Sequence, residues 1–471
     1  MEYKDLKPEQ VFYWFKEISK IPRESGNEEG ISDFLVDFAK KRNLEVSQDE
    51  VLNVLIKKQA SKGKENSPVV MLQGHMDMVC VKDASSKHDF TKDPIELVVE
   101  GDWLRANKTT LGADDGIAVA YALAILDDDK LSHGPLEALI TTGEETSMVG
   151  VNNLDTSKIK AKYLLNLDSE EEGIITVGCA GGMDIEFSFE KKYQENKGEF
   201  LEISLEGFEG GHSGMEIDKY RANAIKQLTR LVNALGEFQI GKIEGGVKRN
   251  AIPTSAKAII SVKDRNSAKN ILEEVKAEIL HEFKNTDPNG SISIKDSEFE
   301  GKVLDEELSK NIISALFVTH DGVYKKYQGN LVTSSNLGLL EEDDTSIKAV
   351  VLARSEITSD KRYRRDIIKK TVEAFGAKVV CKNEYPGWER EESILLDDAG
   401  LLWEKLFGKK AEILTTHGGL ECGLLKEDLK ETDMISFGPT IEGAHSPRER
   451  VSISSVEKNY KYLIELLKVL S

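Results

Sequence analysis

The sequence has few cysteines and no long apolar runs. Its 471 residues contain four cysteines, none in a CxxC spacing, which is too few for a disulfide framework. No segment approaches the roughly 18 consecutive apolar residues that a membrane-spanning helix needs. The polar segment at residues 1–5 lacks the apolar core of a signal peptide. We therefore expect a cytoplasmic protein.

Nucleotide-binding signatures are also missing. The sequence has neither a GxxxxGK[ST] phosphate loop nor a dinucleotide fingerprint. The chain carries 83 acidic and 63 basic residues, for a net charge of −20. Such a surface repels phosphate groups, so we expect neither nucleic acid nor membrane partners. The excess of carboxylates also leaves open that some of them bind metal ions.

The first part of the chain alternates apolar strands with helices. An apolar content of 39% is typical of a folded globular protein, and the length favours two to four domains. Strands are expected at residues 68–72, 136–142 and 163–167, and helices at residues 11–18, 31–42 and 117–126. This order predicts an α/β domain with a mixed, mainly parallel sheet and helices on both faces. Ligands of such sheets bind at the carboxyl ends of the strands.

The pattern changes near residue 183 to strands in which apolar and polar residues alternate. Ile185, Phe187 and Phe189 show this period of two, which is typical of antiparallel sheets with one wet face. Amphipathic helices are expected between these strands, at residues 225–235 and 271–283. We therefore predict a discontinuous catalytic domain, residues 1–185 and 387–471. An α+β lid domain, residues 186–386, would be inserted into it.

Five segments of the first domain carry a histidine or carboxylate at a strand end or in a nearby loop. They contain His75 and Asp77, Asp114 and Asp115, Glu144 and Glu145, Asp168, and His445. Each segment also has an ordinary explanation, such as a turn, a helix cap or a solvated charge. Together they supply two imidazoles and three carboxylates, one of them bridging, as ligands for two metal ions. Nitrogen and oxygen ligands without thiolate suit zinc, and also cobalt or manganese.

Two of the pairs indicate a division of roles. His75 and Asp77 would project to the same side of an extended segment, so that Asp77 can hold the imidazole nitrogen that faces away from the metal. The adjacent Glu144 and Glu145 can diverge, one towards a metal and one towards a water. A metal-dependent hydrolase needs such a ligand next to a general base.

Several short motifs occur in the order known from one protein family. They lie at residues 72–79 (LQGHMDMV), 111–116 (LGADDG), 166–170 (NLDSE), 178–182 (GCAGG), 417–423 (HGGLECG) and 438–440 (GPT). From about residue 5 to the end, the chain resembles the dinuclear zinc aminopeptidases and carboxypeptidases, a family that includes aminoacylases and tripeptidases. The most similar branch is the bacterial aminoacyl-histidine dipeptidases, of the peptidase D or carnosinase-like type. Many relatives have Asp-Asp-Lys-Gly where this chain has Asp114-Asp115-Gly116, a difference that the dipeptidase branch shares.

The resemblance implies specific roles in a metal centre. The first zinc ion would be bound by His75, Asp114 and Asp168, and the second by Asp114, Glu145 and His445. Asp77 would orient His75. Glu144 would be the general base that activates a metal-bridged hydroxide and then the acid that protonates the leaving amine.

The resemblance also implies substrate-binding residues in the lid and in the HGGLECG segment. His212 would stabilise the oxyanion, and Asn250 would bind the carboxyl end of the substrate. Arg354 would receive the terminal carboxylate, which a planar guanidinium matches in a two-pronged way. His417 and Gly419 would complete this group.

The predicted activity is the metal-dependent hydrolysis of dipeptides, namely Xaa-His peptides such as carnosine and other unblocked dipeptides. One alternative is an N-acyl amino acid deacylase with the same metal site. A second is a non-enzymatic metal- or peptide-binding protein, which the complete set of ligands argues against. The expected assembly is a homodimer formed through the lid domain, with a small peptide as the substrate.

Overall fold

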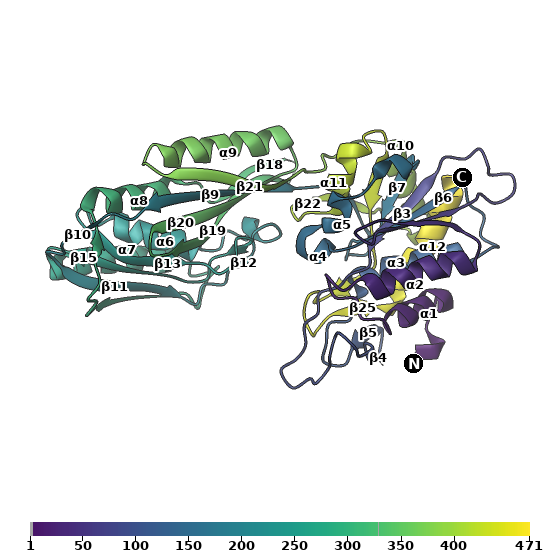
Figure 1. The fold of residues 1–471 in the computed structure, drawn as a ribbon, viewed down its shortest axis with the longest axis horizontal. Helices are drawn as coiled ribbons and strands as arrows, with labels where there is room; N and C mark the ends of the chain where they lie inside the picture. The colour runs from purple at the N-terminus through teal and green to yellow at the C-terminus, as the bar shows by residue number, and fades with distance from the viewer. Residues whose placement is uncertain (1–2, 328) are drawn as a thin grey trace. The chain divides into compact units, whose positions relative to one another are not determined.

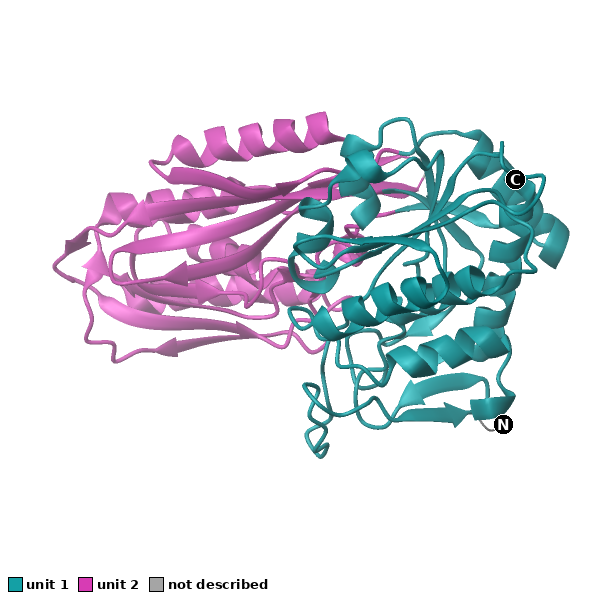
Figure 2. Ribbon diagram, turned by 45° about the vertical axis from the view of Figure 1, so that its right-hand side comes forward, with its two compact units in different colours: residues 1–178, 390–415, 421–471 teal, residues 179–389, 416–420 magenta. Residues whose placement is uncertain are grey.

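The computed structural model describes residues 3–327 and 329–471 (Figure 1). The chain forms two compact units, each with its own hydrophobic core (Figure 2). Unit 1 comprises residues 1–178, 390–415 and 421–471, and unit 2 comprises residues 179–389 and 416–420. The boundary expected at residue 186 falls inside a strand of unit 2, β9 (Gly181–Glu190).

Unit 1 is built around a mixed eight-stranded sheet with the order β1-β2-β6-β3-β7-β23-β8-β22. Its strands are β1 (Glu45–Gln48), β2 (Val54–Lys58), β3 (Val70–His75), β6 (Leu136–Thr141), β7 (Tyr163–Asn166), β8 (Ile174–Cys179), β22 (Glu412–Thr416) and β23 (Asp433–Ser436). The central pairs β6–β3, β3–β7 and β7–β23 are parallel, whereas β1–β2, β2–β6 and β23–β8 are antiparallel. The predicted α/β class is therefore confirmed.

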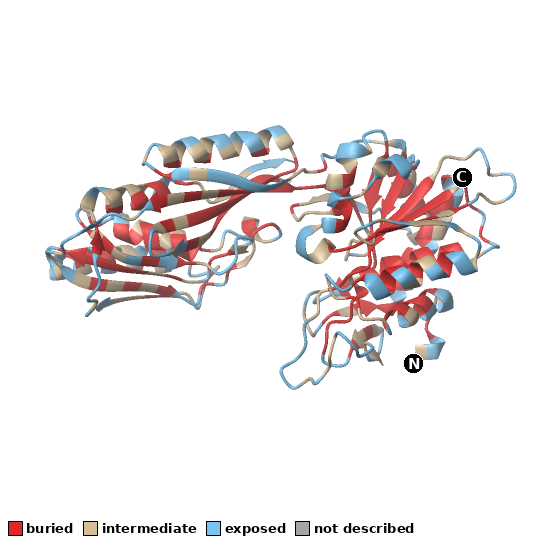
Figure 3. Cartoon of the chain, viewed as in Figure 1, coloured by how far each residue is buried: buried red, intermediate tan, exposed pale blue. Residues whose placement is uncertain are grey.

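The parallel strands at the centre of this sheet place three candidate segments at one edge. His75, the last residue of β3, is in register with Thr141 at the end of β6. Gln73 of β3 is in register with Asn166 at the end of β7. The carboxyl ends of these strands therefore lead into the segments with Glu144 and Asp168. All residues of strands β3, β6 and β7 are buried, as their apolar sequences predict (Figure 3).

Among the described residues of unit 1, eight α-helices surround the sheet or follow its strands. They are α1 (Glu9–Ile18), α2 (Glu29–Lys41), α3 (Ala113–Asp127), α4 (Glu144–Ser147), α5 (Val149–Asn152), α10 (Ile394–Phe407), α11 (Glu421–Asp428) and α12 (Ile453–Val469). Helix α3 contacts α1, α12 and β3, and almost all of its residues are buried. Its lack of a polar face follows from this position, because a helix that is apolar all round must be covered on all sides.

A small antiparallel sheet of unit 1 carries the loop with His445. Its strands are β4 (Leu97–Glu100), β5 (Trp103–Ala106), β24 (Ile441–Glu442) and β25 (Arg450–Ser452), in the order β24-β25-β5-β4. Residues 443–449 connect β24 to β25, and β25 continues directly into α12. The loop is thus held at both ends by paired strands.

Unit 2 is an antiparallel sheet packed against helices. The sheet has the order β16-β11-β15-β13-β19-β20-β9-β21, and β18 also pairs with β19. Besides β9, its strands are β11 (Glu199–Glu206), β13 (Gln239–Gly245), β15 (Ala256–Val262), β16 (Ser291–Asp296), β18 (Gly322–Tyr327), β19 (Asn330–Glu342), β20 (Ser346–Ser355) and β21 (Lys378–Tyr385). Ile185, Phe187 and Phe189 are buried in its core, as their alternation with polar residues predicts.

The helices of unit 2 cover this sheet, and short strand pairs extend the unit. The helices are α6 (Ala224–Asn233), α7 (Arg265–Glu282), α8 (Glu306–Val318) and α9 (Thr358–Glu373). The short pairs are β10 (Tyr193–Gln194) with β17 (Val303–Leu304), and β12 (Gly211–His212) with β14 (Ala251–Ile252). Asn223 caps α6 by accepting hydrogen bonds from the N–H groups of Ile225 and Lys226. Among the described residues, every helix is too short or too polar to span a membrane.

Candidate metal centre

His75 ends β3 with a buried imidazole that faces carboxylates on both sides. Its Nε2 lies 3.2 Å from Oδ1 of Asp114 and 3.5 Å from Oδ1 of Asp168. Its Nδ1 lies 3.1 Å from the main-chain oxygen of Asp77 and 3.4 Å from the carboxylate of the same residue. Two acceptors on Asp77 thus serve the Nδ1 proton, which leaves Nε2 directed at Asp114 and Asp168.

Asp77 is itself held by three donors. Its carboxylate accepts hydrogen bonds from the Ser25 hydroxyl at 2.7 Å and from the N–H groups of Glu144 and Glu145 at 3.1 and 3.3 Å. Burial acts to raise the pKa of Asp77, but its interactions with His75 and these donors lower the pKa to about 2. Asp77 is therefore ionised at neutral pH, and it links His75 to the start of α4.

Asp114 connects the His75 side of the site to His445. Its Oδ2 lies 3.0 Å from Nε2 of His445, while its Oδ1 faces His75. The same nitrogen of His445 lies 2.9 Å from Oε2 of Glu145. A cis peptide bond joins Asp114 to Asp115. Because Oδ1 faces His75 and Oδ2 faces His445, the two oxygens of the Asp114 carboxylate are available to two neighbouring ligand positions.

The structure brings the sequence-predicted ligands into groups of the size that a metal ion needs. In three sets, one ligand atom from each residue lies within 4.8 Å of the others. The sets are His75 with Asp114 and Asp168, His75 with Glu144 and Glu145, and Asp114 with Glu145 and His445. The first and third sets are those that the resemblance implies, and Asp114 belongs to both.

The charges in this group favour a cation. Burial raises the pKa of Glu144 and Glu145, and it raises the pKa of Asp168 to about 6. Hydrogen bonds to Asp114 and Glu145 raise the pKa of His445 to about 11. The carboxylates of this group thus outnumber its two imidazoles, the only groups of the set that can carry a positive charge. Oε1 of Glu145 is also buried without a hydrogen-bond partner among the described residues. The donor set and this orphaned oxygen fit divalent metal ions.

A buried polar network that the sequence analysis missed lies behind these ligands. Glu421, at the start of α11, accepts hydrogen bonds from Gln73 Nε2 and Thr141 Oγ1, both at 2.6 Å. Gln73 Oε1 accepts one from Asn166 Nδ2 at 2.6 Å. Burial raises the pKa of Glu421 to about 7. Gln73 precedes His75 by two residues in a strand, so its side chain is expected on the same side of the sheet as His75. Glu421 lies in the HGGLECG motif, but the sequence does not show that its carboxylate meets Gln73 and Thr141.

The sequence-predicted substrate residues belong to unit 2. His212 of β12 pairs with Ala251 of β14, next to the exposed Asn250. Arg354 of β20 is in register with Ser334 of β19, whose hydroxyl lies 2.8 Å from Nε2 of His417. These contacts place Arg354 and His417 around the same strand pair.

Arg354 and His417 are both buried, and the charge of Arg354 acts on His417. An Nη1–H group of Arg354 donates a hydrogen bond to the Tyr385 hydroxyl at 3.0 Å, and Nε of Arg354 is buried without a partner among the described residues. Burial and the charge of Arg354 lower the pKa of His417 to about 3, so this imidazole is neutral at pH 7. Gly419, also predicted for substrate binding, lies in the same short segment as His417, residues 416–420, and is partly exposed.

Comparison with known proteins decides the family. The model of the peptidase family M20/M25/M40 matches residues 71–469. The chain belongs to this family. It is therefore a peptidase, and the family resemblance predicted from the motifs is confirmed.

Two relatives that are more than 30% identical match over nearly the whole chain. The cytosol non-specific dipeptidase of Escherichia coli (strain K12) is 38% identical over 99% of each protein. The crystal structure of an aminoacylhistidine dipeptidase from Vibrio alginolyticus has a TM-score of 0.90 and 32% identity, covering 100% of this chain and 98% of that one. An aminopeptidase structure from Bacillus cereus, with a TM-score of 0.59, 17% identity and 99% coverage of both chains, shares the fold.

Proposed function

We propose that the protein is a metal-dependent dipeptidase that hydrolyses unblocked dipeptides, including Xaa-His peptides such as carnosine. The observation that carries this proposal is the pair of ligand sets that share Asp114. The names of the two full-length relatives support dipeptides as the substrate class. The name of the Escherichia coli relative also supports the cytoplasm as the compartment.

The proposed metal ligands are the residues of the two sets. His75, Asp114 and Asp168 would hold one ion, and Asp114, Glu145 and His445 the other. Zinc fits these ligands best, and cobalt and manganese accept the same donors. Divalent ions bound here would supply Lewis acidity for the peptide carbonyl and lower the pKa of water.

Glu144 is the proposed general base. It is partly buried next to the proposed ligand Glu145, with Oε2 3.9 Å from Nε2 of His75. Its carboxylate would accept a proton from the attacking water and deliver this proton to the leaving amine. The contact between its main-chain N–H and Asp77 holds the start of α4, from which both glutamates project.

The proposed substrate contacts come from unit 2. Arg354 and Asn250 would bind the terminal carboxylate of the dipeptide, together with His417 and Gly419. His212 would donate a hydrogen bond to the oxyanion that develops at the scissile carbonyl. The unpartnered Nε of the buried Arg354 supports this assignment, because a buried guanidinium donor needs an acceptor.

The test is a panel of dipeptides, with Xaa-His peptides, carnosine and Gly-Gly as members, assayed with chelator and after zinc is added back. The panel includes acetylated amino acids, since a deacylase with the same ligands would cleave these instead. We expect dipeptide cleavage that chelator abolishes and metal restores. Cleavage of acetylated amino acids alone would contradict the dipeptidase. Dipeptide cleavage that persists after all metal is removed would contradict the metal site.

We also propose that the protein is a homodimer formed through unit 2. Strand β21 ends the large sheet of this unit, and Val380 on it is 57% exposed. Sheet edges with exposed apolar side chains readily pair with another chain. Light scattering coupled to size-exclusion chromatography should give twice the 52.4 kDa mass of the chain. A mass of one chain at micromolar concentration would contradict the dimer.

A further inference from the structure

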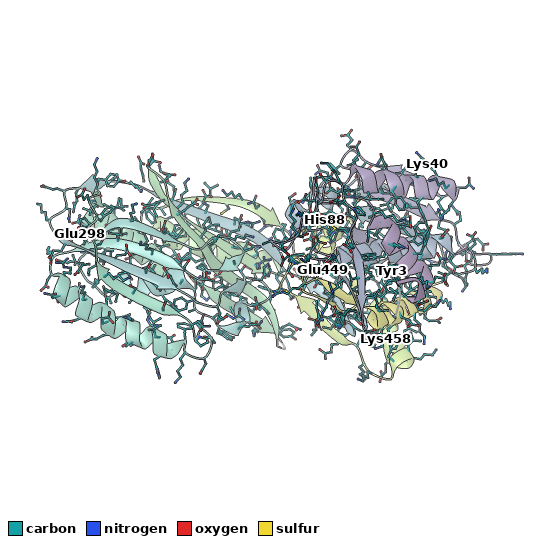
Figure 4. All side chains as sticks on the ribbon, turned by 90° about the horizontal axis from the view of Figure 1, so that it is seen from below. Tyr3, Lys40, His88, Glu298, Glu449 and Lys458 are labelled. Atoms are coloured by element: carbon teal, nitrogen blue, oxygen red, sulfur yellow. The ribbon has the colours of Figure 1, made fainter. Side chains whose placement is uncertain are left out.

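The turn that carries Asp114 is bound by a carboxylate from another part of unit 1. Glu449 is 2% exposed, and its two oxygens accept hydrogen bonds from four consecutive N–H groups. The distances are 2.7 Å to Leu111, 3.0 Å to Gly112, 2.7 Å to Ala113 and 3.3 Å to Asp114. Figure 4 labels Glu449 among the side chains of unit 1. This carboxylate therefore fixes the turn immediately before the shared ligand.

A buried arginine binds the same turn through a carbonyl group, whereas Glu449 binds it through N–H groups. Arg23 is 2% exposed. Its Nη2–H group donates to the carbonyl of Gly112 at 2.5 Å, and its Nη1–H groups donate to the carbonyls of Met76 and Asp77 at 3.0 and 3.3 Å. Gly112 is thus bound through its N–H by Glu449 and through its C=O by Arg23. The turn is tied in this way to the end of β3, where His75 lies.

Glu449 also ends the loop that carries His445. This loop is ordered by its own contacts, in which the N–H of Glu449 and the hydroxyl of Ser446 donate to the carbonyls of Ser446 and Gly443. His445 has a φ of +60°, a left-handed conformation that non-glycine residues rarely adopt and that the surroundings must hold. The anchor at Glu449 lies four residues beyond it.

We propose that Glu449 is a positioning residue for the metal position formed by Asp114, Glu145 and His445, because its buried carboxylate fixes the turn of Asp114 against the loop of His445. Arg23 fixes the same turn against the strand of His75. This inference rests on the proposed metal site. Without the carboxylate, the distance between Asp114 and His445 would no longer be fixed, and this position would bind its metal ion more weakly. Residues that support metal ligands typically contribute 10- to 100-fold in affinity.

The experiment compares full-length wild-type protein with Glu449→Gln, which keeps the side-chain volume but removes the charge and one acceptor. Metal-free protein is titrated with Co²⁺, followed by visible absorption and by calorimetry, and its melting temperature is measured in chelator. We expect the ion held by Asp114, Glu145 and His445 to bind 10- to 100-fold more weakly, with an altered cobalt spectrum. The other ion also uses Asp114, but Arg23 still ties this turn to the strand of His75, so its affinity should fall less. The matched control is Glu442→Gln, at an exposed position on the same hairpin that pairs with Arg450. This control should bind both ions as wild type does.

The outcomes separate this inference from the proposed function. Wild-type protein that binds no Co²⁺ would overturn the metal site itself. If wild type binds two ions and Glu449→Gln binds both with unchanged affinity and spectrum, the positioning role is wrong. Equal weakening of both ions would also contradict it. If Glu449→Gln does not fold, Glu449→Asp, which keeps the charge, should restore folding with an altered affinity for one ion. Failure of both variants to fold would overturn the inference, because Glu449 would then serve the fold as a whole.

Discussion

His445 Nε2 lies 3.0 Å from Oδ2 of Asp114, although 331 residues separate the two in the sequence. The other oxygen of the same carboxylate lies 3.2 Å from Nε2 of His75. A single aspartate therefore stands between two histidines that come from opposite ends of the chain. This position makes Asp114 the residue on which both candidate metal positions depend.

Substitution Asp114→Asn should remove ligands from both positions, whereas Asp168→Asn should affect only the set that contains Asp168. We expect the first variant to lose most of both ions and the second to retain about one, because an amide is a weaker and uncharged ligand. Metal content after dialysis, measured by atomic emission, checks this difference. Equal metal content in the two variants would contradict a shared role for Asp114.

Substitution Glu144→Gln should lower kcat for dipeptides by about 10²- to 10⁴-fold, the usual contribution of a general base. Metal content should stay near that of wild type, because Glu144 is not one of the proposed ligands. The control is Glu171→Gln, at an exposed position in the acidic segment after Asp168. Loss of metal together with activity would show that the base and ligand assignments are wrong.

Substitution Arg354→Met should raise KM for dipeptides with a free carboxyl end by about 10-fold or more, because the charge-assisted hydrogen bonds to that carboxylate are lost. Dipeptide amides, which lack the negative charge, should be affected much less. The comparison needs KM and kcat for one dipeptide and its amide on both proteins. A similar rise for both substrates would mean that Arg354 acts through the structure of unit 2 rather than on the carboxylate.

Stability at acidic pH should depend on His417. Its folded-state pKa of about 3 is below the value of about 6.5 expected when unfolded, so the unfolded state takes up a proton first as the pH falls. The contribution of this histidine to the free energy of unfolding is fully present above about pH 6.5. It declines towards pH 3, by up to about 1.4 kcal/mol per pH unit. Melting curves from pH 7 to pH 4 should therefore fall less steeply for His417→Gln than for wild type. Parallel curves would contradict the buried neutral imidazole.

Substitution Gly112→Ala should destabilise unit 1. Gly112 has a φ of +70°, and an added Cβ would lie 2.4 Å from Nη2 of Arg23 and 2.6 Å from Sδ of Met78. Left-handed backbone alone costs other residues about 1–2 kcal/mol, so we expect at least that loss in urea denaturation. The control is Gly400→Ala in α10, where an added Cβ meets open space and a stabilisation of about 0.5–1 kcal/mol is expected. Equal effects of the two substitutions would contradict the close approach of Arg23.

The elements of the fold were largely predictable because their signals are local. Helix α6 begins and ends within two residues of the expected segment, since its apolar stripe and the capping Asn223 lie next to each other in the sequence. Strands β3, β6 and β7 are short, apolar and bounded by turns, as parallel buried strands are. The exact ends of the two units were harder to predict from the sequence, because residues 416–420 join unit 2 through spatial contacts only.

The sequence by itself determined the family and the types of ligand. A histidine or carboxylate directly after a buried strand is visible as a short motif, and the order of such motifs is specific. Only the tertiary structure decided which groups support the ligands. The contacts of Glu449 with residues 111–114, and of Glu421 with Gln73, join segments more than 300 residues apart. A buried charge is recognisable only from the groups that surround it, because the free energy of burial depends on partners that the local sequence does not contain.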